Sequence, residues 1–229
     1  MDKALNAKQR AGEKSVEYVE DGMTLGLGTG STAYWMVERL GERVREGLDV
    51  RCVPTSLRTE EQARKLGIPL VTLGEVRRLD LTIDGADEIG PGLALIKGGG
   101  GALLREKLVA AASARMIVVA DTGKRVETLG RFPLPVEVVP FAWEVTASRV
   151  AEVTGVEPSA RRAGAELYST DNGNYILDCG CGTIKDPESM ERELKLLPGV
   201  VECGLFVGIA DLAILAGDDG ELEILERRA

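Results

Sequence analysis

Through its first half, the chain alternates short apolar segments with segments of helical periodicity. The apolar segments are rich in β-branched residues and stand at 23–28, 49–56, 68–73, 79–87 and 114–121. Amphipathic patterns typical of helices run over 3–20, 31–47, 59–67 and 102–113. Strands joined by helical crossovers pair in parallel, and strands buried on both faces are near-continuous apolar runs. The pattern therefore predicts an α/β fold with a doubly wound, mainly parallel sheet.

The order of elements changes after residue 131. Strand-like segments are expected at 132–140, 159–168, 173–179 and 199–206, with helices near 142–154 and 187–196. This βαββαβ order is typical of a ferredoxin-like unit. A final strand pair around Gly217–Gly220 is expected to return to the first sheet. We therefore predict an α/β catalytic domain of residues 1–130 and 206–229, with 131–205 as an inserted α+β ferredoxin-like subdomain.

The composition is that of a soluble globular protein. Its 229 residues are 44% hydrophobic, and the polar N-terminal segment lacks the apolar stretch of a signal peptide or a membrane span. We therefore expect a cytoplasmic protein without a membrane partner. A net charge of −9 opposes binding to nucleic acid, which needs a broad field of Lys and Arg. An anionic small molecule can still bind where a few lysines and backbone N–H groups converge.

Histidine is absent from the sequence, which removes several mechanisms at once. Histidine is the usual base of Ser and Cys triads and a usual ligand of catalytic zinc. The four cysteines, Cys52, Cys179, Cys181 and Cys203, are irregularly spaced and are expected to be reduced, buried thiols. Acid–base chemistry must therefore fall to carboxylates and lysines, and no metal site is expected.

A glycine-rich turn, GLGTGSTA at 26–33, joins the first predicted strand to a helix. Glycines allow a tight bend there, and the N–H groups that start the helix favour an anion, with Ser31 and Thr32 as hydroxyl donors. A dinucleotide-binding turn needs a third glycine where Ser31 stands, and a P-loop needs a lysine after the glycines. The motif favours a mononucleotide or phosphosugar site, and a purely structural turn is the alternative.

Carboxylates crowd the end of the strand in DLTIDGADEI at 80–89, where Asp84, Asp87 and Glu88 follow an apolar run. Ligands of open α/β sheets bind at the carboxyl ends of the strands. Crowded carboxylates repel one another unless a cation or a hydroxyl-rich ligand shares the space. Capping of the next turn is the alternative, but the pair of Asp84 and Asp87 favours contacts to sugar hydroxyl groups.

The segment IKGGGGALLREKLVAAA at 96–112 places Lys97 before four glycines and a helix that carries Glu106. Four consecutive glycines lose much chain entropy on folding, and close approach of backbone N–H groups to a ligand is a reason for them. That interpretation sets Lys97 beside an anion and turns Glu106 toward the same cleft. A solvated Glu106 on an amphipathic helix is the alternative.

In VADTGKRV at 119–126, Asp121 ends another strand and Lys124 follows in the loop. The loop belongs to the same edge of the predicted sheet, so Lys124 is a candidate partner for a phosphate or an oxyanion. A solvated loop residue is the alternative of equal weight, because charged residues in loops usually face water.

Taken together, GTGSTA, DGADE, KGGGGALLREK and ADTGKRV resemble the type A ribose-5-phosphate isomerases in order and spacing. The resemblance extends over essentially the whole chain, including the inserted second domain. It implies an aldose–ketose isomerase that interconverts D-ribose 5-phosphate and D-ribulose 5-phosphate in the non-oxidative branch of the pentose phosphate pathway. It also implies a sugar-phosphate partner, no cofactor, and a homodimer or a dimer-based homo-oligomer.

The resemblance assigns roles to individual residues. Glu106 matches the family's proton acceptor, and Asp84, Asp87 and Lys97 complete the expected catalytic set. The implied substrate contacts are Thr29, Gly30, Ser31, Thr32, Asp84, Gly85, Ala86, Asp87, Lys97, Gly98, Gly99, Gly100 and Lys124, with Lys8 as a further phosphate-facing lysine. Gly101 stands where other members can carry alanine.

The expected mechanism moves a proton between C2 and C1 through an enediolate, with Glu106 as the base. Lys97 and the glycine N–H groups would stabilise the developing oxyanion, while Asp84 and Asp87 assist ring opening and proton exchange between O1 and O2. The alternatives are a sugar-phosphate sensor without catalysis and an acyl or CoA transferase with a covalent glutamate adduct. The acidic balance and the short segment before the first strand argue against a DNA-binding module.

Overall fold

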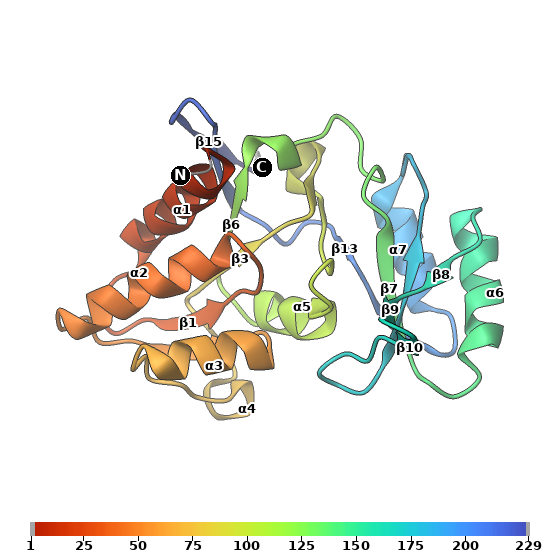
Figure 1. Cartoon of the computed structure of the whole chain (residues 1–229), viewed down its shortest axis with the longest axis horizontal. Helices are drawn as coiled ribbons and strands as arrows, with labels where there is room; N and C mark the ends of the chain where they lie inside the picture. The colour runs from red at the N-terminus through yellow and green to blue at the C-terminus, as the bar shows by residue number, and fades with distance from the viewer. Residues whose placement is uncertain (1–2, 228–229) are drawn as a thin grey trace. The chain divides into compact units, whose positions relative to one another are not determined.

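The computed structural model of the chain describes residues 3–227, which form two compact units (Figure 1). The first unit is assembled from Met1–Ala86, Arg105–Lys124 and Ile209–Ala229, and the second from Asp87–Leu104 and Arg125–Gly208. The chain thus crosses between them four times, at Ala86–Asp87, Leu104–Arg105, Lys124–Arg125 and Gly208–Ile209. The domain division expected at 1–130 with 206–229, and at 131–205, stays a prediction.

The first unit contains a six-stranded sheet in the order β15-β14-β6-β3-β1-β2. All neighbouring strands are parallel except β14 and β15, which form an antiparallel pair. This confirms the mainly parallel sheet and the return of the last strand pair to it. The strands are β1 (Thr24–Leu27), β2 (Arg51–Pro54), β3 (Leu81–Gly85), β6 (Met116–Asp121), β14 (Leu212–Ala216) and β15 (Leu222–Glu226).

Helices cover both faces of this sheet, as a doubly wound fold requires. On one face, α1 (Lys3–Ser15) packs beside α2 (Ala33–Arg45) and against β6 and β14 (Figure 1). The large apolar cluster on that face includes Leu25 and Leu27, which alternate with Gly26 along β1. On the other face, Val109 of α5 (Leu103–Ala111) packs with Val53 and Leu79. Shorter elements are η1 (Val16–Tyr18), α3 (Leu57–Lys65), α4 (Leu73–Val76) and η3 (Thr122–Lys124).

The prediction of a strand at 68–73 in the first unit is wrong. The segment makes a single parallel bridge, between Cys52 and Leu70, and no strand of its own. Its pairing stops because the chain turns at Thr72, whose backbone N–H donates to the carboxylate of Glu75 at 2.7 Å as α4 begins. This N-terminal cap diverts the chain away from the sheet after one bridge.

The second unit contains a four-stranded antiparallel sheet in the order β12-β7-β11-β8. Its elements follow one another as βαββαβ, which confirms the ferredoxin-like prediction. The two helices contact each other, so they cover the same face. The elements are β7 (Leu134–Val138), α6 (Trp143–Thr154), β8 (Ser159–Ala160), β11 (Tyr175–Cys179), α7 (Pro187–Lys195) and β12 (Val200–Cys203).

Two predicted strands of the second unit are divided in the structure. The segment 159–168 forms only β8 and then a small hairpin of β9 (Arg162–Ala163) and β10 (Glu166–Leu167), because the chain turns at Gly164. The segment 199–206 serves two sheets: β12 joins the four-stranded sheet, whereas β13 (Leu205–Phe206) pairs with β5 (Leu95–Ile96). A three-stranded sheet is completed by β4 (Glu88–Ile89), and η2 spans Pro91–Leu93.

The four cysteines are reduced thiols. Burial raises the pKa of Cys52 and of Cys179 to about 12, and it also raises the pKa of the half-buried Cys181. Thiolates are the reactive form, so Cys52 and Cys179 are unsuited to nucleophilic chemistry near neutral pH.

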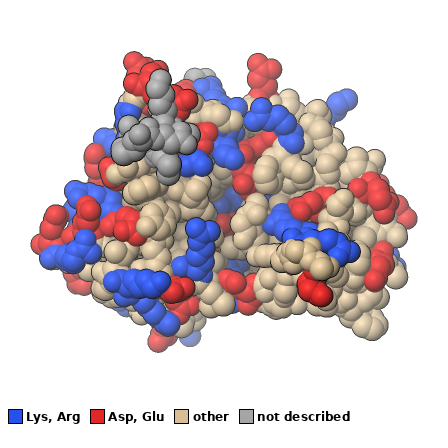
Figure 2. Space-filling model, viewed as in Figure 1, with Lys and Arg blue, Asp and Glu red and all other residues tan. Residues whose placement is uncertain are grey.

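The charged side chains are mixed on the surface. Lys and Arg are interspersed with Asp and Glu on the face that Figure 2 shows. In the described part of the chain, no helix combines the length and the apolar character needed to cross a membrane.

Gly26 allows α5 to approach β1 closely, and its replacement by alanine tests this packing. An added Cβ would overlap the hydroxyl of Thr82 and lie 2.5 Å from Cγ1 of Val109. We expect Gly26→Ala to lower the free energy of unfolding by about 1–3 kcal/mol in urea denaturation. Gly180→Ala is the control, because its Cβ would meet open space and its effect should stay within about 0.5 kcal/mol. Equal stability of the two variants would contradict the packing described.

Candidate active site

Three predicted segments of the first unit meet at the carboxyl edge of its sheet. Strands β1, β3 and β6 are neighbours, and they lead into the turn at 28–32, the acidic segment at 84–86 and the loop that holds Lys124. Open α/β sheets bind ligands at this edge. Lys124 ends η3 and is half-buried.

Asp84 fixes the backbone of the glycine-rich turn. Its side chain is fully buried, and Oδ1 accepts hydrogen bonds from the N–H groups of Thr29 at 2.9 Å and of Gly85 at 2.7 Å. Gly28 donates to the carbonyl of Ile83 at 2.9 Å, so the turn lies directly against the end of β3. A Cβ at Gly28 would overlap both the backbone and the carboxylate of Asp84. Glycine is therefore required at this position.

Thr29 uses its hydroxyl group inside the protein. Its Oγ1 lies 2.8 Å from Oγ1 of Thr55, 2.7 Å from Oγ of Ser56 and 3.1 Å from Oγ1 of Thr59. The cluster also reaches the turn's backbone, because Thr59 donates to the carbonyl of Gly28 at 3.0 Å. Sequence reasoning missed these three partners of Thr29, and the hydroxyl-rich end of β2 was the available signal.

The rest of the turn leads into α2. Gly30 has a φ of +131°, Ser31 is exposed and Thr32 is buried. Since α2 begins at Ala33, the N–H groups of its first turn and its dipole favour an anion next to Ser31. This arrangement supports the predicted phosphate loop, with Ser31 and the backbone as its accessible donors.

Glu106 is placed by the packing of α5 on the sheet. Just after the helix, the hydroxyl of Ser113 bonds that of Thr82 near the start of β3 at 2.6 Å, and Val109 packs at Gly26 within β1. The helix therefore runs antiparallel to the strands. Glu106, three residues before Val109 on the same face, lies about 4.5 Å farther toward the carboxyl edge. Its side chain is 3% exposed, so the alternative of a solvated surface glutamate is wrong.

The second unit holds the other predicted residues, Asp87 and the Lys97–Gly101 loop. Lys97 is only 2% exposed, and its ammonium lies 5.4 Å from the centre of the Phe206 ring. The backbone N–H of Lys97 donates to the carbonyl of Gly204 at 2.9 Å. Asp87 accepts a hydrogen bond from the N–H of Gly99 at 2.7 Å. The loop after a buried lysine is thus tied to one of the predicted carboxylates.

Lys8 lies on α1 and is half-buried beside the core residues Ala7 and Ala11. Its expected contact with phosphate stays a prediction. The same holds for the individual roles of the other residues named from the sequence.

Within the described residues, one group could be considered for a metal: Glu191, Glu202 and Cys203. Both oxygens of Glu202 already have partners, since Lys195 lies 3.2 Å from Oε2 and the N–H of Cys203 donates to Oε1 at 2.9 Å. A neighbouring ammonium opposes a bound cation, so this group does not fit a metal.

Comparison with known proteins decides between the alternatives. A family model described as ribose 5-phosphate isomerase A (phosphoriboisomerase A) matches residues 51–220. The chain belongs to the ribose 5-phosphate isomerase A family. Ribose-5-phosphate isomerase A of Nitrobacter hamburgensis is 55% identical over 96% of this chain and 97% of its own. The relative from Listeria innocua is 51% identical over 97% of this chain and 100% of its own.

Solved structures of this isomerase family share the fold. Ribose 5-phosphate isomerase from Plasmodium falciparum is 39% identical and superposes with a TM-score of 0.95, covering 98% of this chain and 100% of that one. A D-ribose-5-phosphate isomerase in complex with phospho-erythronic acid is 37% identical with a TM-score of 0.94, covering 99% of this chain and 100% of that one. The family expected from the four motifs is confirmed, and the chain is an isomerase.

The hydroxyl cluster around Thr29 can be tested through stability. Thr29→Val keeps the shape of the side chain but leaves Thr55, Ser56 and Thr59 without their shared partner. We expect a loss of about 1–3 kcal/mol in the free energy of unfolding, measured in urea. Thr29→Ser is the control because it retains the hydroxyl and should be clearly more stable than Thr29→Val. A valine variant as stable as the wild type would show that the cluster contributes nothing.

Proposed function

We propose that this chain interconverts D-ribose 5-phosphate and D-ribulose 5-phosphate by proton transfer through an enediolate. The observation that carries the proposal is the structural relative bound to phospho-erythronic acid. That ligand joins a phosphate to a carboxylate, whose two oxygens resemble those of an enediolate. The first unit has a glycine-rich turn at the start of α2 and the buried carboxylate of Asp84 at one sheet edge, and both are groups that would suit such a compound.

Glu106 is the proposed base. A carboxylate held near both carbons can take the proton from C2 and return it to C1. The buried position of Glu106 on α5 supports this role, because its orientation is set by helix packing and not by a mobile surface rotamer. Pre-positioning of the base reduces the entropy that the reaction must otherwise lose.

Lys97 and the N–H groups of its glycine loop are proposed to stabilise the negative charge that develops on the sugar oxygens. A buried ammonium interacts strongly with such a charge because little water screens it. Asp84 and Asp87 are proposed to assist ring opening and the exchange of a proton between O1 and O2. Their bonds to backbone N–H groups hold both carboxylates in fixed positions.

The turn at 29–32, with Lys124 and Lys8, is proposed to bind the phosphate. Binding energy at the phosphate is remote from the reacting carbons, so it can be used to position C1 and C2 against the base. Ser31 and the first turn of α2 are the groups best placed to donate.

The proposal also covers the metal and cofactor requirement, the cellular location, the pathway and the oligomeric state. We propose a metal-independent enzyme without a cofactor, acting in the cytoplasm in the non-oxidative branch of the pentose phosphate pathway. A homodimer or a dimer-based assembly is proposed on the same family grounds. The mixed acid–base set of carboxylates and lysine supplies the chemistry of proton transfer without a Lewis acid.

The function is tested by a coupled assay of ribose 5-phosphate conversion in the presence of a chelator. We expect ribulose 5-phosphate to form at the same rate with and without the chelator. A chelator-sensitive rate would overturn the metal-independent mechanism. Binding of ribose 5-phosphate without turnover would instead indicate a sugar-phosphate sensor.

Glu106→Gln tests the proposed base directly. The amide has nearly the same shape but cannot accept the proton, so we expect kcat to fall by at least about 10²–10⁴-fold. Affinity for phospho-erythronic acid, measured by calorimetry, should change much less. Glu61→Gln on the exposed face of α3 is the matched control and should retain full activity. Near-normal turnover by the Glu106 variant would exclude it as the base.

A further inference from the structure

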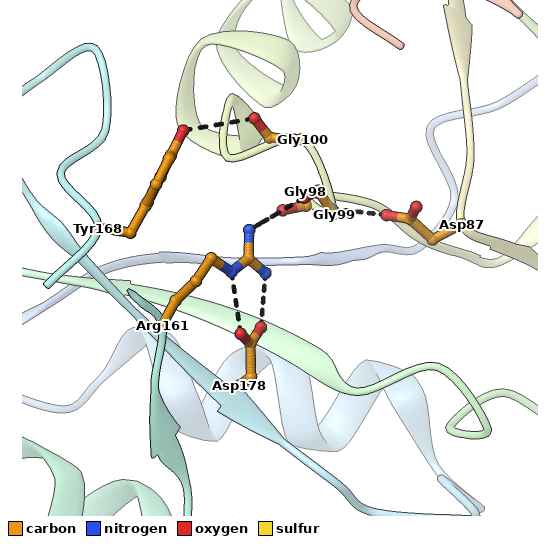
Figure 3. Close-up of polar contacts among 7 residues, drawn as sticks. All are labelled: Asp87, Gly98, Gly99, Gly100, Arg161, Tyr168 and Asp178. Carbon is orange, nitrogen blue, oxygen red and sulfur yellow. Dashed lines mark hydrogen bonds and ion pairs between the residues drawn. The ribbon is translucent and has the colours of Figure 1, made fainter. Parts of the chain in front are cut away.

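Arg161 joins the four-stranded sheet of the second unit to the glycine loop (Figure 3). Its Nε and Nη2 donate to the two carboxylate oxygens of Asp178, at 2.9 and 2.5 Å. Its Nη1 donates to the carbonyls of Gly98 at 2.9 Å and of Gly99 at 3.1 Å. The side chains of Arg161 and Asp178 are only 16% and 25% exposed. One guanidinium therefore links a strand carboxylate to two consecutive loop carbonyls.

The loop needs such a link because glycines restrain it little. Gly98 and Gly101 have φ angles of +102° and +79°, in the region that L side chains rarely adopt. A glycine segment without external contacts samples many backbone conformations. In this loop the carbonyls of Gly98 and Gly99 are both captured by Arg161.

Capture of a carbonyl also fixes the direction of the next N–H group. The peptide unit is planar and trans, so the C=O of one residue and the N–H of the next point in opposite directions. The carbonyl of Gly98 points to Arg161, and the N–H of Gly99 accordingly points to Asp87, to which it donates at 2.7 Å. By the same geometry, the Gly99 carbonyl on Arg161 directs the N–H of Gly100 away from the guanidinium.

Tyr168 adds a second contact from the same hairpin region. Its hydroxyl lies 3.5 Å from the carbonyl of Gly100, and the Arg161 guanidinium lies 5.9 Å from the centre of its ring. Desolvation and the nearby Asp171 raise the pKa of Tyr168, so its hydroxyl stays protonated and can donate. A Cβ at Gly101 would overlap the Tyr168 ring and hydroxyl, which explains the fourth glycine of the run.

The residues of the four-stranded sheet that hold the Arg161 guanidinium are rigid. Asp178 lies within β11, between its partners in β7 and β8. The backbone of Arg161 is held as well, because its N–H donates to the carbonyl of Ile176 and its carbonyl accepts from Tyr168, both at 2.8 Å. Arg161 thus has a fixed backbone, and its counter-ion, Asp178, is also fixed. Its planar fork can serve the carboxylate and the carbonyls at once, which the single ammonium of lysine cannot do.

We propose that Arg161 is a positioning residue of the isomerase, oriented by Asp178 and assisted by Tyr168. Arg161 holds the Lys97–Gly100 loop in the one conformation in which the Gly100 N–H and Asp87 serve the reacting end of the sugar. The inference rests on the proposed function, because the loop's role in stabilising the enediolate belongs to it. The phosphate end is assigned to a different loop, so Arg161 should influence kcat more than KM.

The test compares Arg161→Ala with Arg162→Ala in the full-length protein. Arg162 is the adjacent arginine, is exposed, and donates to the carbonyl of Ala165 within the hairpin. We expect Arg161→Ala to lower kcat on the order of 10- to 100-fold, with KM for ribose 5-phosphate changed less than about 3-fold. Arg162→Ala should match the wild type. Guanidinium chloride at millimolar, non-denaturing concentration should restore part of the kcat of Arg161→Ala only.

Hydrogen exchange gives a readout independent of turnover. We expect backbone amides of residues 98–101 to exchange faster in Arg161→Ala, while those of β7 and β11 stay as protected as in the wild type. Global loss of protection would call for Arg161→Lys, which keeps the charge and should show the same loop-confined change. Unchanged kcat and unchanged loop exchange in a folded variant would overturn the proposal. A wild-type protein without isomerase activity would overturn the proposed function first, and this result is distinct from any outcome of the variants.

Discussion

The carboxyl edge of the first unit depends on how closely the backbone at Gly28 approaches Asp84. A buried carboxylate is unfavourable unless its oxygens are bonded, and here two backbone N–H groups satisfy Oδ1. In return, those bonds fix the turn that leads into α2. The turn consists of glycine and small hydroxyl residues, so its shape is set by this neighbouring strand end and by the hydroxyl cluster around Thr29. Any side chain at position 28 would separate the two.

In both units a charged side chain fixes a glycine-rich backbone segment through hydrogen bonds, but the side chain accepts in one unit and donates in the other. In the first, a carboxylate accepts from the N–H groups of a glycine turn; in the second, an arginine donates to the carbonyls of a glycine loop. Each device relies on a side chain held in a strand or beside one. Flexible backbone is thereby made rigid without bulky side chains that would keep a substrate at a distance. The helix that carries Glu106 achieves the same fixed geometry through packing at Gly26.

Sequence patterns predicted the sheet, because apolar runs are local signals, and strand-end glycines and charges supplied the candidate site residues in the same way. The predictions failed where the outcome depended on a distant partner. Residues 68–73 have a strand-like composition, yet the capping of α4 at Thr72 ends their pairing. The partners of Thr29 come from another crossover, and backbone carbonyls, the partners of Arg161, have no sequence signature. The adjacent Arg161 and Arg162 cannot be told apart until the hairpin is in place.

The chain passes between its two units at four points, and three of them lie inside motifs that mark the family. One crossing separates Asp84 from Asp87, a second separates Lys97 from Glu106, and a third directly follows Lys124. Each unit therefore carries only part of the expected catalytic set. A recombination event that exchanged the second unit would bring a foreign Asp87 and Lys97 into a chain that kept its own Asp84 and Glu106. The second unit can vary at its far strands and helices, but the junctions inside these motifs must be inherited together with the unit that hosts it.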